Sequence, residues 1–531
     1  MYDLATQLMN RRTTLHGLRT PHEQTWRECF DYSHPIRGGG FNGESNDTGA
    51  AKKKRADLLD STSTESARTL ASSIMGGMTP SNSRWFGLGV GHETDEEKRW
   101  LDESAETLWE NIHATNFDAA GFEACIDIVD AGWFVLFIDE DRERGGLTFE
   151  QWPIDTVYCA ASKRGGMIDT VFRDYELTAG QCVAEFGAEN CSEKINRLVA
   201  DNKPDEKIKL LHAIYPRTPY AVGAMRSKNL PFASCHVDVE SKKLVRESGF
   251  HELPVVVPRW MVIPKSVYAV GPMFDALPDV KQLNRLIYLE DMNADLAISG
   301  MWIAEDDGVL NPRTVKIGPR KIIVANSVDS MKPLQSGANF ELSFTKKEQL
   351  QAQIRKILMA DQLQPQDGPA MTATEVHERV RLIRQLLGPV YGRLQAEYLQ
   401  PLIERCFGLA FRAGVFNPPP ESLTDRNFHV TYISPMAKSQ KLEEVSAIQQ
   451  TLLSAGELQP LVPDIMDNFD TDAAIRMVSE GNGAPSKLLR PVKDRDQMRQ
   501  QRTEAAQQAQ QQEQQAALTQ SMAPQMVKNA A

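Results

Sequence analysis

Two acidic clusters are the groups in this chain whose types and spacing could do chemistry. They run from Asp139 to Asp141 and from Glu305 to Asp307. Carboxylates of this kind hold the metal ions of two-metal nucleases, which need them to converge from separate elements. Each cluster instead falls within one predicted turn, where solvated charge is the expected state. A metal-dependent nuclease therefore stays open as an alternative function.

Other catalytic patterns are incomplete. The chain has no Gly-Lys-Ser/Thr segment, so it lacks the phosphate-binding loop of motor ATPases. Four histidines precede a glutamate, but none has the second histidine, four positions on, that the zinc-protease motif requires. These are His22, His92, His251 and His377. The segment from Gly87 to Gly91 lacks the third glycine of a dinucleotide-binding loop at the required spacing, because position 92 is His. We therefore expect no enzyme activity, no cofactor and no metal.

The length and net charge of the chain limit the possible functions further. A chain of 531 residues is expected to form about two to four structural units. Its net charge of −12 argues against a broad basic face that grips nucleic acid, but not against a conduit past which DNA slides. One basic run, from Lys52 to Arg55, can contact phosphate or simply begin a solvated helix.

The cellular compartment is predicted from the absence of a membrane span, a signal peptide and paired cysteines in the sequence. No apolar run approaches the roughly 20 residues of a membrane span. The first residues lack the pattern of a signal peptide, which predicts a protein made in a cytoplasm without a membrane partner. The seven cysteines include no Cys-x-x-Cys pair, which suits buried reduced thiols and not a zinc site.

The N-terminal part is predicted to be helical. Helices are expected over residues 1–35, 55–77 and 93–116. The first should break near Pro21, because proline lacks the N–H that an interior helical position donates. Thr62 or Ser63 is expected to cap the second helix, and Gly76-Gly77 to stop it.

The middle of the chain changes its hydrophobic period. Residues 133–263 alternate apolar and polar side chains and are predicted to be mostly β, with one helix inserted near 178–200. Helices over 274–299 and 345–358 then flank a β-like module of about forty residues. On the first of these two helices, Val280, Leu283 and Ile287 recur at helical spacing and are expected to pack against a neighbour.

The C-terminal third is predicted to be helical again. A polar loop over 361–371 precedes a long amphipathic helix that begins near 372, is kinked at Pro389 and Pro401, and ends near Gly414. Residues 440–480 are expected to be helical. The Gln-rich tail, from about 491, can be either an exposed polar helix or disordered.

Several motifs in this order resemble the head-to-tail connector (portal) proteins of short-tailed bacteriophages. The most specific lies between Asp60 and Leu88: an Asp-Ser-Thr, a helix of small residues, a Gly-x-Met-Thr-Pro turn and the pair Trp85-Phe86. Further similar segments are 19–35, 277–284, 371–376, 387–405 and 432–435. The middle β region and the tail match this family only loosely.

The resemblance implies an α+β subunit of portal type that assembles as a ring. Its parts would be a wing (1–270), a first stem helix (271–300), a clip (301–343), a second stem helix (344–360), a channel loop (361–371), a long kinked helix with the return strand of the wing (372–434), a helical crown (435–490) and the tail (491–531). The β module between two helices, derived above from periodicity, agrees with the clip between its stem helices.

The resemblance also implies a function. A dodecameric ring at one capsid vertex would let double-stranded DNA be packaged and ejected, in contact with scaffolding and major capsid proteins. The terminase large subunit and then the tail adaptor would dock on the clip, for which the basic residues Arg313, Lys316, Arg320 and Lys321 are the candidates. The polar loop residues Gln362, Gln364, Gln366 and Asp367 would face DNA in the channel. A scaffold or a tail adaptor remains the structural alternative.

Overall fold

A computed structural model describes most of the chain. It covers residues 3–41, 48–82, 84–90, 94–141, 144–218, 227–299, 302–304, 331–333, 340–363, 388–424, 431–433, 435–458, 463–481, 488–490 and 492–528. These residues form two compact units, each built from two separate stretches of the sequence. The first unit combines residues 1–81 with 115–405, and the second combines residues 82–114 with 406–531.

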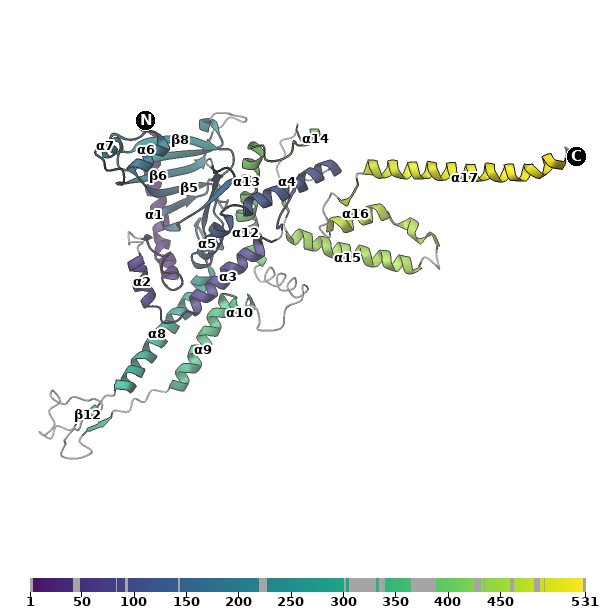
Figure 1. Ribbon diagram of the computed structural model, residues 1–531. Coiled ribbons are helices and arrows are strands. Elements are labelled where there is room, and N and C mark those ends of the chain that lie inside the picture. The colour runs from purple at the N-terminus through teal and green to yellow at the C-terminus, as the bar shows by residue number, and fades with distance from the viewer. Residues whose placement is uncertain are drawn as a thin grey trace. The chain divides into compact units, whose positions relative to one another are not determined.

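Helices of the first unit lie before and after its sheets in the chain, with two more inserted between strands. They are α1 (Leu4–Asp31), α2 (Thr48–Ala56), α3 (Thr62–Met78), α5 (Phe117–Asp130), α6 (Ala179–Phe186), α7 (Glu193–Ala200), α8 (Pro272–Ser299), α9 (Phe340–Ile357), α10 (Ala360–Leu363) and α12 (Gly388–Leu394), with a π-helical segment over Gln395–Leu399. Helix α8 packs against α1, α5 and α9, and α3 packs against α5 and α9 (Figure 1).

Two antiparallel sheets form the centre of the first unit. The larger has the order β4-β5-β6-β7-β8 and the smaller the order β3-β2-β9. Their strands are β2 (Val135–Glu140), β3 (Leu147–Trp152), β4 (Val157–Ala160), β5 (Thr170–Thr178), β6 (Lys207–Pro216), β7 (Phe232–Asp238), β8 (Lys243–Phe250) and β9 (Val255–Val256). Two-stranded pairs join β10 (Met261–Val262) to β11 (Ala269–Val270), and β12 (Trp302–Ala304) to β13 (Met331–Pro333).

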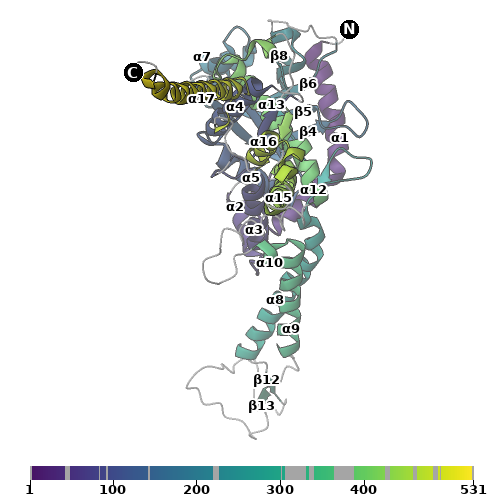
Figure 2. The same cartoon turned by 90° about the vertical axis from the view of Figure 1, so that its right-hand side faces the viewer.

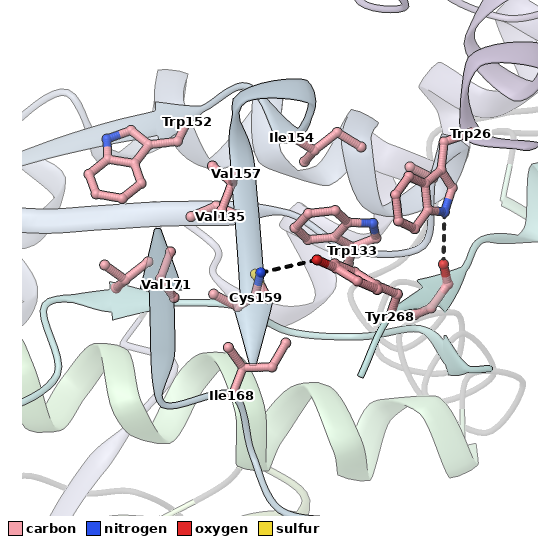
Figure 3. Close-up of a cluster of buried hydrophobic side chains, with 14 of the residues drawn as sticks. Trp26, Trp133, Val135, Trp152, Ile154, Val157, Cys159, Ile168, Val171 and Tyr268 are labelled. Atoms are coloured by element: carbon pink, nitrogen blue, oxygen red, sulfur yellow. Dashed lines mark hydrogen bonds between the residues drawn. The ribbon is translucent and has the colours of Figure 1, made fainter. Parts of the chain in front are cut away.

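An aromatic core joins α1 to both sheets. The buried rings of Trp26, Trp133 and Tyr268 meet edge to face or tilted, with centroids 5.3 to 5.4 Å apart. Figure 3 shows the two hydrogen bonds that orient them: Trp26 Nε1 donates to the Ala269 carbonyl at 3.0 Å, and the Tyr268 hydroxyl accepts from the Cys159 backbone N–H at 3.1 Å. The polar atoms of Trp26 and Tyr268 are therefore satisfied while both rings are buried.

The second unit joins a helix from early in the sequence to the C-terminal part. Its elements are β1 (Gly87–Gly89), α4 (Asp95–His113), α13 (Gln400–Arg412, which begins in the first unit), α14 (Glu421–Thr424), β14 (Thr431–Ile433), α15 (Pro435–Leu458), α16 (Thr471–Gly481) and α17 (Val492–Lys528). Strand β1 pairs antiparallel with β14. Trp100 of α4 packs edge to face on Phe407, and its Nε1 donates to the Asn417 carbonyl at 2.8 Å.

Several predicted elements are confirmed. The mostly β region, the long helix that ends at Ser299 and the helix that follows the β12–β13 pair are all present. Helix α13 ends just before Gly414, which has a φ of +70°. The interruption expected at Pro401 takes the form of a π-helical segment directly before α13. Helix α17 covers most of the Gln-rich tail.

Other predictions were wrong. Helix α1 continues through Pro21, because buried residues on both sides, including Leu15 and Trp26, fix it against the sheets. Because an interior proline is costly, Pro278 is expected only in the first turn of its helix, but α8 begins at Pro272 and carries Pro278 beyond that turn. The N-cap of α3 is Ser61, and Gly76-Gly77 stay helical since α3 runs on to Met78. The inserted helix is two helices, α6 and α7, and α5 was not predicted at all.

Within the described part of the chain, no helix is both long and apolar enough to cross a membrane.

Candidate assembly site

Apolar side chains hold α8 and α9 together as a pair. The buried residues are Val280, Leu283 and Ile287 of α8 and Leu350 and Ile354 of α9. Their spacing of three and four positions places each set on one helical face. Further along, Glu290 of α8 accepts a hydrogen bond from the Ser343 hydroxyl of α9, and its carboxylate lies 3.9 Å from Lys347 Nζ. The two helices run antiparallel (Figure 1), and this contact places Glu290 and Ser343 at the same height.

The loop before α3 is clamped to α8 by Asn284. The Asn284 Oδ1 atom accepts from the Leu59 backbone N–H at 2.8 Å, and its Nδ2 donates to the Asp57 carbonyl at 2.9 Å. One turn earlier, Lys281 Nζ lies 2.5 Å from Glu28 of α1. Polar bonds therefore join the middle of α8 to elements from the start of the chain.

Asp60 makes the matching contact with α9. One carboxylate oxygen accepts from Gln351 Nε2 at 2.9 Å, and the other accepts from the Thr62 N–H at 2.8 Å. The start of α3 is tied in turn to the end of α1, because the hydroxyls of Ser63 and Thr64 donate to backbone carbonyls of residues 32 and 33. Asp60 thus couples the position of α9 to that of α3.

Large apolar side chains remain exposed on the other faces of the pair. Tyr288, Leu289 and Met292 of α8 are 49%, 42% and 47% exposed, and Phe344 of α9 is 60% exposed. Apolar side chains that gather on one element mark an interaction surface more often than isolated ones do. The α8–α9 pair is therefore the candidate assembly site of the first unit.

A cavity of about 920 Å³ between the two sheets holds the titratable side chains that most resemble a catalytic group. The His212 and His236 rings stack with centroids 4.0 Å apart. His212 Nε2 lies 2.9 Å from the Ser234 hydroxyl, and the Tyr175 hydroxyl lies 2.7 Å from His236 Nδ1. Among the described residues no carboxylate bonds His212, so the Ser–His pair lacks the third member of a triad.

Burial keeps both imidazoles neutral. Loss of hydration lowers the pKa of His236 to about 3, and Arg246 adds to this effect. Loss of hydration also lowers the pKa of His212 well below its usual value, with a smaller contribution from His236. Neutral rings can stack and accept hydrogen bonds, so the pair stabilises the sheet at neutral pH.

We predict that acid weakens the first unit through these histidines. Since the unfolded histidine has a pKa near 6.5, stability is complete above that pH and falls as pH drops toward the folded pKa. Between pH 7 and pH 5, His236 alone should cost about 2 kcal/mol of unfolding free energy. Chemical denaturation at several pH values measures this loss, and His236→Gln should make the pH dependence shallower by one proton. An unchanged slope in that variant would contradict the assignment.

The acidic cluster from Asp139 to Asp141 lies beside a buried cation. Arg405 is almost fully buried and its Nη2 lies 3.4 Å from Asp139, while its Nη1 lies 3.2 Å from Glu252. This contact gives Asp139 a structural role. The cluster from Glu305 to Asp307 lies outside the described residues. In the part of the chain that is described, no group of three or more His, Cys, Asp or Glu side chains is placed to hold a metal ion.

Comparison with known families identifies the chain. The family model described as "Bacteriophage head to tail connecting protein" matches residues 5–489. The chain belongs to this family. A portal protein of Salmonella phage epsilon15 is 27% identical over 517 residues, which cover 94% of this chain and 91% of that protein. A probable portal protein of Bordetella phage BPP-1 is 26% identical over 514 residues, covering 92% and 89%.

This connector protein also has limited similarity to a chain of a solved particle. The virion of a native gene transfer agent particle contains a chain that is 12% identical, with a TM-score of 0.33, over 76% of this chain and 94% of that one.

The motifs that predicted a connector protein are structural in this chain. Arg19 and Glu23 form a buried ion pair at 2.8 Å, and the Arg19 guanidinium also donates to the Val157 carbonyl at 2.8 Å. His34 Nδ1 lies 2.8 Å from the buried Asp130 carboxylate. These contacts join α1 and the segment after it to the sheets and to α5.

Most of the residues predicted to act at connector docking sites lie outside the described residues. This holds for the clip candidates Arg313, Lys316, Arg320 and Lys321, and for the loop residues Gln364, Gln366 and Asp367. Gln362 lies in the short helix α10, and nothing is described of its side chain. Val280, Leu283 and Ile287, predicted to pack against a neighbour, are buried.

The sequence did not predict the residues that tie the start of α3 to α8 and α9 in this connector protein. Asp60 and Asn284 each lie within a motif that carried the resemblance, but neither was given a role. Gln351 lies 291 positions from Asp60, so no local pattern could have paired the two. Asn284 bonds the backbone of residues 57 and 59, directly before the Asp-Ser-Thr, so the two motifs lie side by side in space. The only signal in the sequence was that both segments resemble the same family.

Proposed function

We propose that this protein is the portal of a short-tailed phage: a ring, expected to have twelve copies, at one vertex of the capsid. Double-stranded DNA enters and leaves through the centre of the ring. The packaging motor docks on its outer end during packaging, and the tail adaptor docks there afterwards. The protein acts as a structural part of the virion and not as an enzyme.

The family match over residues 5–489 is the observation that carries this proposal. Relatives described as portal proteins cover most of the chain, which favours a portal over a scaffold or a tail adaptor. The exposed apolar faces of α8 and α9 fit the same function, because neighbouring subunits of a ring would cover them. In this proposal α8 and α9 are the stem, and the β12–β13 pair belongs to the clip.

The contacts of the ring with its partners follow as proposals. The basic residues Arg313, Lys316, Arg320 and Lys321 would receive the motor and the tail adaptor on the clip. The polar residues from Gln362 to Asp367 would line the channel and, without a cation among them, contact DNA weakly. Scaffolding and major capsid proteins are further proposed partners of the ring.

The mass and shape of the purified 59.4 kDa chain test the proposal. Light scattering combined with negative-stain imaging should show rings with a central hole. A stable dimer with a cleft would contradict a portal.

Two substitutions separate folding of the stem from assembly of the ring. Leu283→Asp places a charge in the buried α8–α9 contact and should cost about 3 kcal/mol or more, so neither the helix pair nor the ring should form. Met292→Asp changes an exposed side chain and should leave the subunit folded but impair the ring. Thermal melts and light scattering on both variants measure this. Rings from Leu283→Asp would show that α8 and α9 are not the stem.

A further inference from the structure

The α8–α9 pair presents two different outward faces. On α8, Arg285 lies two positions from both Leu283 and Ile287, which puts it about 200° around the helix from the face that meets α9. The exposed Leu289 and Met292 share this outward side. On α9, Glu348 lies two positions before the buried Leu350 and is likewise turned outward, one turn from the exposed Phe344.

The charges of these two faces stand at the same height. Glu290 and Ser343 are bonded across the pair, which fixes the relative position of the helices. Arg285 lies five residues before Glu290, and Glu348 lies five residues after Ser343. Because the helices are antiparallel (Figures 1 and 2), both lie about 7.5 Å from that contact in the same direction.

The exposed apolar residues of the two faces also lie at similar heights along the helix pair. Met292 lies two residues beyond Glu290, and Phe344 lies one residue from Ser343, so their heights differ by about 4.5 Å. Long side chains span such an offset easily. Among the described residues neither Arg285 nor Glu348 has an ion-pair partner within its own chain.

We propose that the α8 face of one subunit docks on the α9 face of a second copy of this chain, with Arg285 against Glu348 of the next copy. Leu289 and Met292 then pack against Phe344 of that copy. The two faces differ, so the contact is head to tail and repeats around a closed ring. This inference rests on the proposed ring and names the surfaces that close it.

Charge reversal in two separate variants tests this register. In Arg285→Glu every interface sets two carboxylates against each other, and in Glu348→Arg it sets two guanidinium groups against each other. Each variant alone should need at least about tenfold more protein for half-assembly, equivalent to about 1.4 kcal/mol per contact. An equimolar mixture should assemble again as alternating rings, because each contact then joins opposite charges.

Two controls keep the result specific. Lys346→Glu reverses an exposed charge on a different face of α9 and should assemble like the wild type. The variant that combines Arg285→Cys with Glu348→Cys should form a ladder of disulfide-linked oligomers on oxidation, whereas each single variant should not. The seven native cysteines are all buried and should stay unreacted.

The outcomes distinguish this inference from the proposed function. Loss of assembly in both reversed variants, with recovery in the mixture, supports the Arg285–Glu348 contact. Wild-type rings that survive both reversals, or a mixture that fails to recover, overturn the contact and leave the ring standing. A wild-type chain that forms no ring overturns both.

Discussion

Gly132→Ala should destabilise the first unit by about 4 kcal/mol or more. Gly132 has a φ of +88°, a conformation that costs an alanine about 1–2 kcal/mol. A Cβ atom there would also lie 2.0 Å from the carbonyl carbon of Val270 and 2.4 Å from the N of Gly271. These are backbone atoms that lead directly into α8, so relief requires β11 and the start of α8 to move.

Denaturant unfolding followed by tryptophan fluorescence measures this loss. Gly17→Ala is the matched control, since nothing lies within 4 Å of a Cβ at that exposed helical position. It should stabilise α1 by up to about 1 kcal/mol, because alanine is the better helix former. Gly132 lies just after the end of α5, and residues 270 and 271 lie just before α8. A loss below about 1 kcal/mol for Gly132→Ala would therefore show that the two backbones do not approach each other this closely.

Arg259→Met should cost about 3–5 kcal/mol, because it leaves a buried carboxylate without its partner. Arg259 Nη2 lies 2.6 Å from one oxygen of Glu397, and Nε lies 2.9 Å from the other. Both side chains are at least nine-tenths buried. Glu397 belongs to the π-helical segment, so the bond also fixes the place where the helix changes its pitch.

A double-mutant cycle separates the ion pair from simple packing. Glu397→Leu alone should cost a similar amount, whereas Arg259→Met combined with Glu397→Leu should cost much less than the sum. The half-exposed pair Lys194–Glu240 is the control, and Lys194→Met should leave the free energy of unfolding nearly unchanged because exposed ion pairs contribute little. Additive losses at Arg259 and Glu397 would show that the two side chains are not coupled.

Local patterns predicted those elements whose cause is local. The period of α8 and the glycine after α13 can be read from a few neighbouring residues, and both are present. Helix α5 was missed because its C-terminal half, from Ala124 to Asp130, is buried on every side and so has no exposed polar face to reveal a helical period. Pro21 misled the prediction because tertiary packing outweighs the cost of one proline.

The candidate site was predictable only in part. The spacing of Val280, Leu283 and Ile287 revealed a face that packs, but not what it packs against. The contacts of Asn284 with residues 57–59 join segments about 225 positions apart, and the height at which Glu290 meets Ser343 depends on how the pair closes. Such long-range contacts leave no periodic signal in one sequence.

The pairing of β1 with β14 sets an order of events during synthesis of the chain. Thr431, the partner of Gly89, leaves the ribosome 342 residues later (431 minus 89). At roughly 5–20 residues per second, β1 therefore waits about 17–70 s for its partner strand. Trp100 of α4, which packs on Phe407, is left without that cover over nearly the same interval. The first unit is complete at residue 405 and can fold before the second, so during that interval the nascent chain carries α4 with its apolar face uncovered.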